Sequence, residues 1–153
     1  MTHSELINRA EKWLRGSLDC RVVLTEFKAY TYSGETPDAI GWKESHCILV
    51  EVKTSKSDFM ADQKKRSRRK GFPAMGNYRF YFAEKGVLDG CEIPEGWGLY
   101  EVCGRTVRHN RGVSYKSFGQ KLNESCKQSE IAMLVSALVR GRKKDCIRTL
   151  YGS

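Results

Sequence analysis

The sequence lacks the features that mark membrane-spanning and secreted proteins. No stretch reaches the roughly 18 apolar residues that a membrane helix needs. Residues 1–16 contain no apolar core of the kind found in a secretory signal. The six cysteines form no CxxC pair, which argues against a zinc ribbon and against a compact disulfide framework. We therefore expect reduced thiols, a cytoplasmic location and no membrane partner.

Acidic residues are also in short supply. The chain has 18 Asp and Glu against 27 Lys and Arg, which gives a formal net charge of +9 at pH 7. A strongly basic protein attracts polyanions, and nucleic acid is the leading candidate partner. The alternative is a basic surface that serves only solubility.

The length of 153 residues fits a single domain over residues 1–153. Apolar residues at helical spacing predict helices, and β-branched and aromatic runs predict strands. The expected helices cover residues 4–15, a segment that begins at Ser57 and runs into the basic stretch, and 129–144; the expected strands cover 21–30, 38–42, 48–53, 77–84 and 96–102. A strand–helix–strand order predicts an α/β fold with a parallel or mixed sheet. Its core should span about 4–102, followed by a helical and basic extension over about 105–153.

The segment ILVEVKTSKSDF, residues 48–59, places Glu51 and Lys53 inside an otherwise apolar strand. The alternation of a strand sends both side chains to the same face. A buried charge needs a partner, because an unpaired one is costly. Asp38 follows Pro37 at the start of the neighbouring strand and is expected to bring a second carboxylate beside Glu51. The alternative, a simple ion pair between Glu51 and Lys53, leaves Asp38 unexplained.

Two carboxylates and a lysine suit the hydrolysis of a phosphodiester. Hard oxygen ligands hold Mg²⁺ or Mn²⁺, and the expected ligands are Asp38, Glu51 and the main-chain carbonyl of Val52. The metal would activate water and neutralise charge at phosphorus, while Lys53 would orient the water or stabilise that charge. No histidine is needed as a general base, so His3 is not assigned a role.

The order Pro37-Asp38 and then Glu51-Val52-Lys53 resembles the PD-(D/E)XK nuclease superfamily. A closer similarity is to the MmcB-type DNA-repair branch and related phage nucleases. It rests on TEF at 25–27, ILVEVKTSKSDFMADQKK at 48–65, YRFYFAE at 78–84 and IPEGWGLYEV at 93–102. The resemblance implies a restriction-endonuclease-like core, with a central mixed β-sheet flanked by helices.

The resemblance also implies roles for single residues. Asp38 and Glu51 would be metal ligands, Lys53 the catalytic lysine, and Glu26 an additional acidic residue of the first strand. The alternative for Glu26 is an ordinary position on the exposed face of that strand. Residues from about 105 onward match no motif of the superfamily.

The implied activity is that of a metal-dependent deoxyribonuclease in DNA repair, recombination or phage DNA processing. Such a protein would work in the cytosol of a bacterium or of a phage-infected host. A homodimer is plausible, because many enzymes of this superfamily pair to cut two strands. Two alternatives stay open: a nuclease that acts on RNA, and a nucleic-acid-binding module that keeps the nuclease scaffold without turnover.

A basic run follows the motif strand by one helix. It places six positive charges in seven residues: Lys64, Lys65, Arg66, Arg68, Arg69 and Lys70. Its position predicts contacts with nucleic-acid phosphates near the site, although a run of charges is more often a solvated face. Asp58 and Asp62, one helical turn apart, are interpreted as an acidic face at the helix N-terminus and not as metal ligands.

Overall fold

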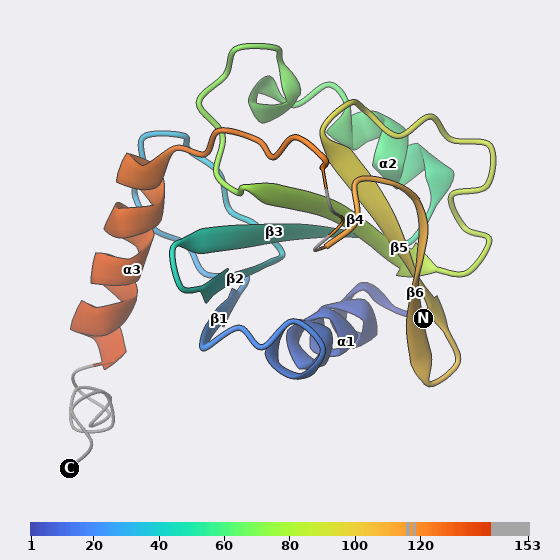
Figure 1. Cartoon of the computed structure of the whole chain (residues 1–153), viewed down its shortest axis with the longest axis horizontal. Coiled ribbons are helices and arrows are strands. Elements are labelled where there is room, and N and C mark those ends of the chain that lie inside the picture. The colour runs from blue at the N-terminus through green and yellow to red at the C-terminus, as the bar shows by residue number, and fades with distance from the viewer. Residues whose placement is uncertain (116, 118, 142–153) are drawn as a thin grey trace.

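A computed structural model describes residues 1–115, 117 and 119–141 of the chain (Figure 1). Within these residues the fold is α/β, as predicted, with one six-stranded mixed sheet and three α-helices. The elements are α1 (His3–Gly16), β1 (Val22–Thr25), β2 (Ala39–Lys43), β3 (His46–Lys53), α2 (Lys56–Asp62), β4 (Tyr78–Glu84), β5 (Trp97–Cys103), β6 (Thr106–Gly112) and α3 (Lys127–Gly141), with a short 3₁₀ helix at Arg66–Arg68.

The strands lie in the sheet in the order in which they occur along the chain. β1, β2 and β3 are antiparallel, β3, β4 and β5 are parallel, and β6 returns antiparallel to β5. The connection from β3 to its parallel neighbour β4 carries α2, so the strand–helix–strand prediction is confirmed. β3 and β4 are therefore central strands with both faces covered.

One face of the sheet is covered by α1 (Figure 1). The helix begins with a capping box, in which Thr2 Oγ1 accepts from the Glu5 N–H and the Glu5 carboxylate accepts from the Thr2 N–H. Its apolar stripe includes Trp13, whose ring lies 4.5 Å from the Tyr100 ring, centroid to centroid. The stripe packs on the β3 residues that alternate with Glu51 and Lys53, and the chain thereby has a continuous core on this side.

The opposite face carries α2 and α3. Phe59 of α2 and Met133 of α3 are both fully buried against this face, together with Leu49 of β3 and Tyr81 of β4. Glu51 and Lys53 belong to the same face as Leu49, because side chains alternate along β3. The polar cluster described below is therefore embedded in a second hydrophobic core.

The largest differences from the predicted boundaries are at the ends of the first strand and of the second helix. The first strand ends at Thr25 and not at residue 30, since Glu26 adopts a positive φ of 46° and leaves the extended conformation. The helix after β3 ends at Asp62, and the basic run continues as a turn and a 3₁₀ helix. The predicted helix at 129–144 is α3, whose described part ends at Gly141; residues 142–153 of the predicted extension lie outside the described residues.

Within the described residues, no helix has the length and apolar content required to cross a bilayer.

Candidate functional site

β3 presents Glu51 and Lys53 on one face, side by side, as its alternation predicted. Both residues are buried, with only 5% and 4% of their surfaces exposed. β3 is flanked by β2 and β4, so neither side chain lies at an edge of the sheet. Two ionisable groups at such positions require partners within the protein or from a ligand.

Asp38 lies beside Glu51, immediately before the first residue of β2. The antiparallel register pairs Ala39 with Val50, which places Asp38 opposite Glu51. Asp38 Oδ2 accepts a hydrogen bond of 2.9 Å from the main-chain N–H of Val52. The structure therefore brings Asp38, Glu51 and the Val52 backbone together, as the sequence predicted.

The surroundings of Glu51 disfavour the charged form of its carboxyl group. Burial raises its pKa to about 8, and the neighbouring carboxylate of Asp38 contributes to the rise, while the Arg68 guanidinium opposes it. Two carboxylates that share a site favour either a proton or a cation between them.

The wider cluster combines four carboxylates with two buried cations. Among the described residues, the buried or partly buried carboxylates of the cluster are Glu35, Asp38, Glu51 and Asp62, and its buried cations are Lys53 and Arg68. The hard oxygen donors of Asp38 and Glu51 are of the type that Mg²⁺ and Mn²⁺ prefer. The residues present therefore fit the predicted metal, and the Val52 carbonyl is available as a further donor. The part of the chain that is described contains no group of three or more His, Cys, Asp or Glu residues arranged around one metal position.

Glu26 is connected to Asp38 from the side of β1. Its main-chain N–H donates to the Asp38 carbonyl oxygen at 3.0 Å, while its side chain is 63% exposed. The imidazole of His3 lies between the two carboxylates, with Nε2 3.4 Å from Asp38 Oδ1 and Nδ1 4.0 Å from Glu26 Oε1. The structure thus adds His3, which the sequence analysis had left without a role, to the surroundings of Asp38.

Asp62 is the partner of Lys53. The Lys53 ammonium lies 3.2 Å from Asp62 Oδ1 and 4.0 Å from Asp58 Oδ1. The side chain of Asp62 has no exposed surface and also accepts a 2.6 Å hydrogen bond from the Tyr81 hydroxyl. The interpretation of Asp62 as part of an exposed acidic face is wrong, because the end of α2 turns this residue toward the sheet. Asp58, with 41% of its side chain exposed, matches that interpretation.

Arg68 is the second cation at the centre of the cluster. Its guanidinium donates to both oxygens of Asp62, at 2.8 and 3.1 Å, and lies 3.4 Å from Glu51 Oε1 and 3.8 Å from Glu35 Oε2. It also covers the ring of Trp97 at 4.5 Å from the centroid. Only 4% of the Arg68 side chain is exposed, so this residue differs from the rest of the basic run.

The network holds its members in defined charge states. Burial alone would raise the pKa of Asp62, but the Arg68 guanidinium, the Tyr81 hydroxyl and Lys53 outweigh it and hold the pKa well below its usual range. Burial likewise opposes the charge of Arg68, yet Glu51, Tyr81 and Asp62 keep its pKa above the ordinary value. Asp62 is therefore an anion and Arg68 a cation at all physiological pH values.

The other members of the basic run lie at or near the surface. Lys65 keeps 53% of its side chain exposed while it reaches Asp62 Oδ1 at 3.0 Å. The guanidinium of Arg66 lies over the ring of Phe72, 5.4 Å from its centroid. Lys64, Arg69 and Lys70 are exposed. The predicted phosphate contacts of this run stay a prediction, and the exposed members have the accessibility that such contacts require.

Comparison with known proteins adds a fold and no function. No family model matches the chain. No curated protein matches it either. A solved structure, the SPO1766 protein of unknown function from Silicibacter pomeroyi, is similar with a TM-score of 0.63 and 17% sequence identity, over 100% of this chain and 96% of that chain. The similarity at this identity concerns the fold alone.

Proposed function

We propose that this chain is a metal-dependent nuclease that hydrolyses DNA phosphodiester bonds, with a restriction-endonuclease-like core of the PD-(D/E)XK type. The observation that carries the proposal is the convergence of Asp38, Glu51 and Lys53 on one face of a central strand. Asp38 lies immediately before β2 and Glu51 lies on the adjacent strand β3, and burial together with the Asp38 carboxylate raises the pKa of Glu51. The net charge of +9 supports a polyanionic substrate.

Each residue has a definite task in this proposal. Asp38 and Glu51 would hold the metal, which when bound supplies a Lewis acid for the phosphate and a more acidic water. The raised pKa allows Glu51 to keep a proton when no metal is bound. On binding the metal, Glu51 would release that proton. The exposed carboxylate of Glu26 lies next to this pair through His3 and would assist in positioning water.

Lys53 would act on the scissile phosphate. An ammonium group has three donors, and the contact with Asp62 at 3.2 Å uses one of them. The remaining donors can orient the attacking water or stabilise negative charge on the non-bridging phosphate oxygens. Asp62 fixes the position of the ammonium group, so it acts on the reaction only through Lys53.

The test is a cleavage assay on single-stranded, duplex, nicked and branched DNA with Mg²⁺, with Mn²⁺ and with EDTA. We expect cleavage with either metal, none with EDTA, and a loss of at least about 100-fold in Lys53→Ala and in Glu51→Ala. Glu51→Gln, which keeps the shape of the side chain, should lose as much. Glu11→Gln removes one carboxylate from α1, on the opposite face of the sheet, and is the control that should keep wild-type activity. Absence of cleavage by the wild type, or equal cleavage by all variants, would refute the proposal.

One observation favours a second candidate function, a nucleic-acid-binding module without turnover. The guanidinium of Arg68 already lies 3.4 Å from Glu51, so part of the charge of that carboxylate is balanced by the protein itself. Such a module would bind DNA equally well in EDTA and in Mg²⁺ and would cut none of the substrates. RNA of the same sequence belongs in both assays, because the hydrolytic chemistry does not distinguish the two sugars.

A further inference from the structure

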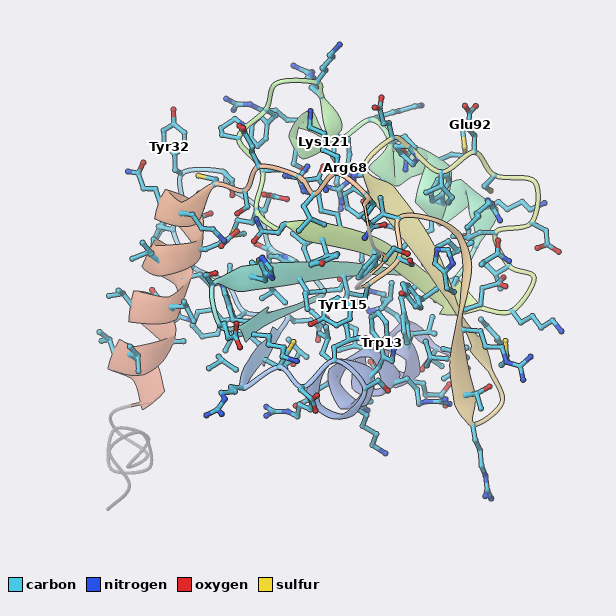
Figure 2. All side chains as sticks on the ribbon, in the orientation of Figure 1. Trp13, Tyr32, Arg68, Glu92, Tyr115 and Lys121 are labelled. Atoms are coloured by element: carbon cyan, nitrogen blue, oxygen red, sulfur yellow. The ribbon has the colours of Figure 1, made fainter. Side chains whose placement is uncertain are left out.

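A groove of about 810 Å³ opens on the α2 side of the sheet, next to the buried cluster. Residues 67–72, which follow α2, form one wall. Residues 94–97 and 120–124 contribute to the other wall, so residues 120–124, which match no motif, help to enclose the groove. Figure 2 shows Arg68 and Lys121, one from each wall, close together on this side of the molecule.

The walls of the groove are fixed by hydrogen bonds. Asn123 Nδ2 donates to the Gly96 carbonyl at 2.9 Å, and the Asn123 N–H donates to the Asn77 carbonyl at 3.1 Å. The Arg79 guanidinium donates to three main-chain carbonyls, including that of Glu124 at 3.3 Å. The groove is therefore a formed feature of the surface and needs no rearrangement to accept a ligand.

The charge of the groove favours an anion. Arg69, Lys70 and Lys121 line it and are exposed, against the two exposed carboxylates of Glu95 and Glu124. Arg68 and Arg79 line it too, with their donors directed at protein oxygens. The exposed groups leave an excess of one positive charge.

The groove adjoins the candidate metal site at one shared side chain, and Asp38 and Glu51 do not themselves line it. Arg68 lines the groove, and the same guanidinium lies 3.4 Å from Glu51 Oε1. A ligand that fills the groove therefore ends within one side chain of the carboxylate pair. Phe72 supplies an aromatic ring to the wall, of the kind on which nucleic-acid bases stack.

From these features we propose that the groove binds one strand of DNA and guides it to Asp38 and Glu51, so that the substrate class is single-stranded DNA or the single-stranded part of a branched molecule. This inference rests on the proposed nuclease function. The volume lies within the roughly 300–1,000 Å³ of ligand pockets and suits a few nucleotides of one strand.

The test is fluorescence anisotropy in EDTA, where no cleavage occurs, with a labelled 10-nucleotide single strand and the duplex of the same sequence. We expect the single strand to bind at least about 10-fold more tightly than the duplex. Phe72→Ala should weaken binding of the single strand by about 5- to 100-fold, the range typical of one lost stacking contact. Lys121→Ala should make the slope of log K against log salt shallower by about 0.7, the value for one lost phosphate contact on a single strand.

Lys12→Ala is the matched control for the charge change. Lys12 is an exposed lysine of α1, which covers the opposite face of the sheet. It should leave both the affinity and the salt slope unchanged. The inference is overturned if the duplex binds as tightly as the single strand, or if Lys121→Ala and Phe72→Ala differ from the wild type no more than Lys12→Ala does. Tighter binding of the corresponding RNA would overturn the assignment to DNA.

Failure of the inference and failure of the proposed function give different results. Cleavage of duplex DNA together with weak binding of the single strand overturns the groove assignment and leaves the nuclease proposal intact. Groove-dependent binding of the single strand without cleavage in any metal overturns the nuclease proposal and leaves the groove as a DNA-binding surface. If both hold, Lys53→Ala binds the single strand with wild-type affinity and does not cut it.

Discussion

The substitution Asp62→Asn tests whether the buried ion network is built as described. Asp62 has no exposed side-chain surface and accepts from Lys53, Lys65, Arg68 and Tyr81 at 2.6 to 3.2 Å. Asparagine keeps the size of the side chain but removes the negative charge, and its NH₂ group cannot accept a hydrogen bond. The cations then remain buried without their main partner. Breaking a buried pair in this way typically costs about 3–5 kcal/mol.

The assay is thermal or urea unfolding of the metal-free protein at pH 7. For a domain of about 150 residues, 1 kcal/mol changes the melting temperature by about 2–4 °C, so we expect a decrease of roughly 6–20 °C. Asp58→Asn removes the same charge from the same helix at a side chain that is 41% exposed and 4.0 Å from Lys53. It should cost less than about 1 kcal/mol. Equal stabilities of the two variants would refute the assignment of Asp62 as the buried partner.

Further predictions concern pH, charge and backbone geometry. Glu51 has a folded-state pKa of about 8 against an unfolded value of 4.5. Its contribution to the stability of the protein without metal is therefore complete below pH 4.5 and is lost as the pH rises through 8. Unfolding measured from pH 4 to 9 should show a loss of up to about 5 kcal/mol, which is absent in Glu51→Gln and is reduced by saturating Mg²⁺. Arg68→Met removes the cation that lowers this pKa, and the upper end of the same transition should move above pH 8; an unchanged transition would contradict the contact. Gly76→Ala should lower the free energy of unfolding by about 1–3 kcal/mol, because Gly76 has a φ of +94° and an added Cβ would lie 2.9 Å from Leu49 Cβ. Gly71→Ala is the control: its φ is +81° and an added Cβ would meet no atom within 4 Å, so it measures the backbone strain alone and should cost less.

The sequence was sufficient to predict the fold class and most of the elements. The alternation in residues 48–53 and the apolar stripe of α1 are local signals that survive in the structure, since both faces of β3 are buried. The early end of β1 was not predictable, because the positive φ of Glu26 depends on its hydrogen bond to the Asp38 carbonyl, a contact from the neighbouring strand. The end of α2 was obscured by a basic run with good helix propensity.

The candidate site was predictable only where periodicity and strand pairing place the residues. Asp38 beside Glu51 follows from an antiparallel neighbour, and the same face for Lys53 follows from alternation. The burial of Asp62 and Arg68 has no local signal, since a charged residue in a charged run normally faces water. One indication was available: Lys53 on a buried strand requires an anionic partner, and Asp62 lies in the helix that directly follows.

The most direct test of the account is a crystal structure with Mn²⁺, with the anomalous signal of manganese used to locate the ion. We predict one peak between the carboxylates of Asp38 and Glu51, within coordinating distance of both, and its loss in Glu51→Gln crystals treated in the same way. No peak there at saturating Mn²⁺, or Asp38 and Glu51 side chains directed away from each other, would contradict the central claim that the two carboxylates together hold a divalent metal.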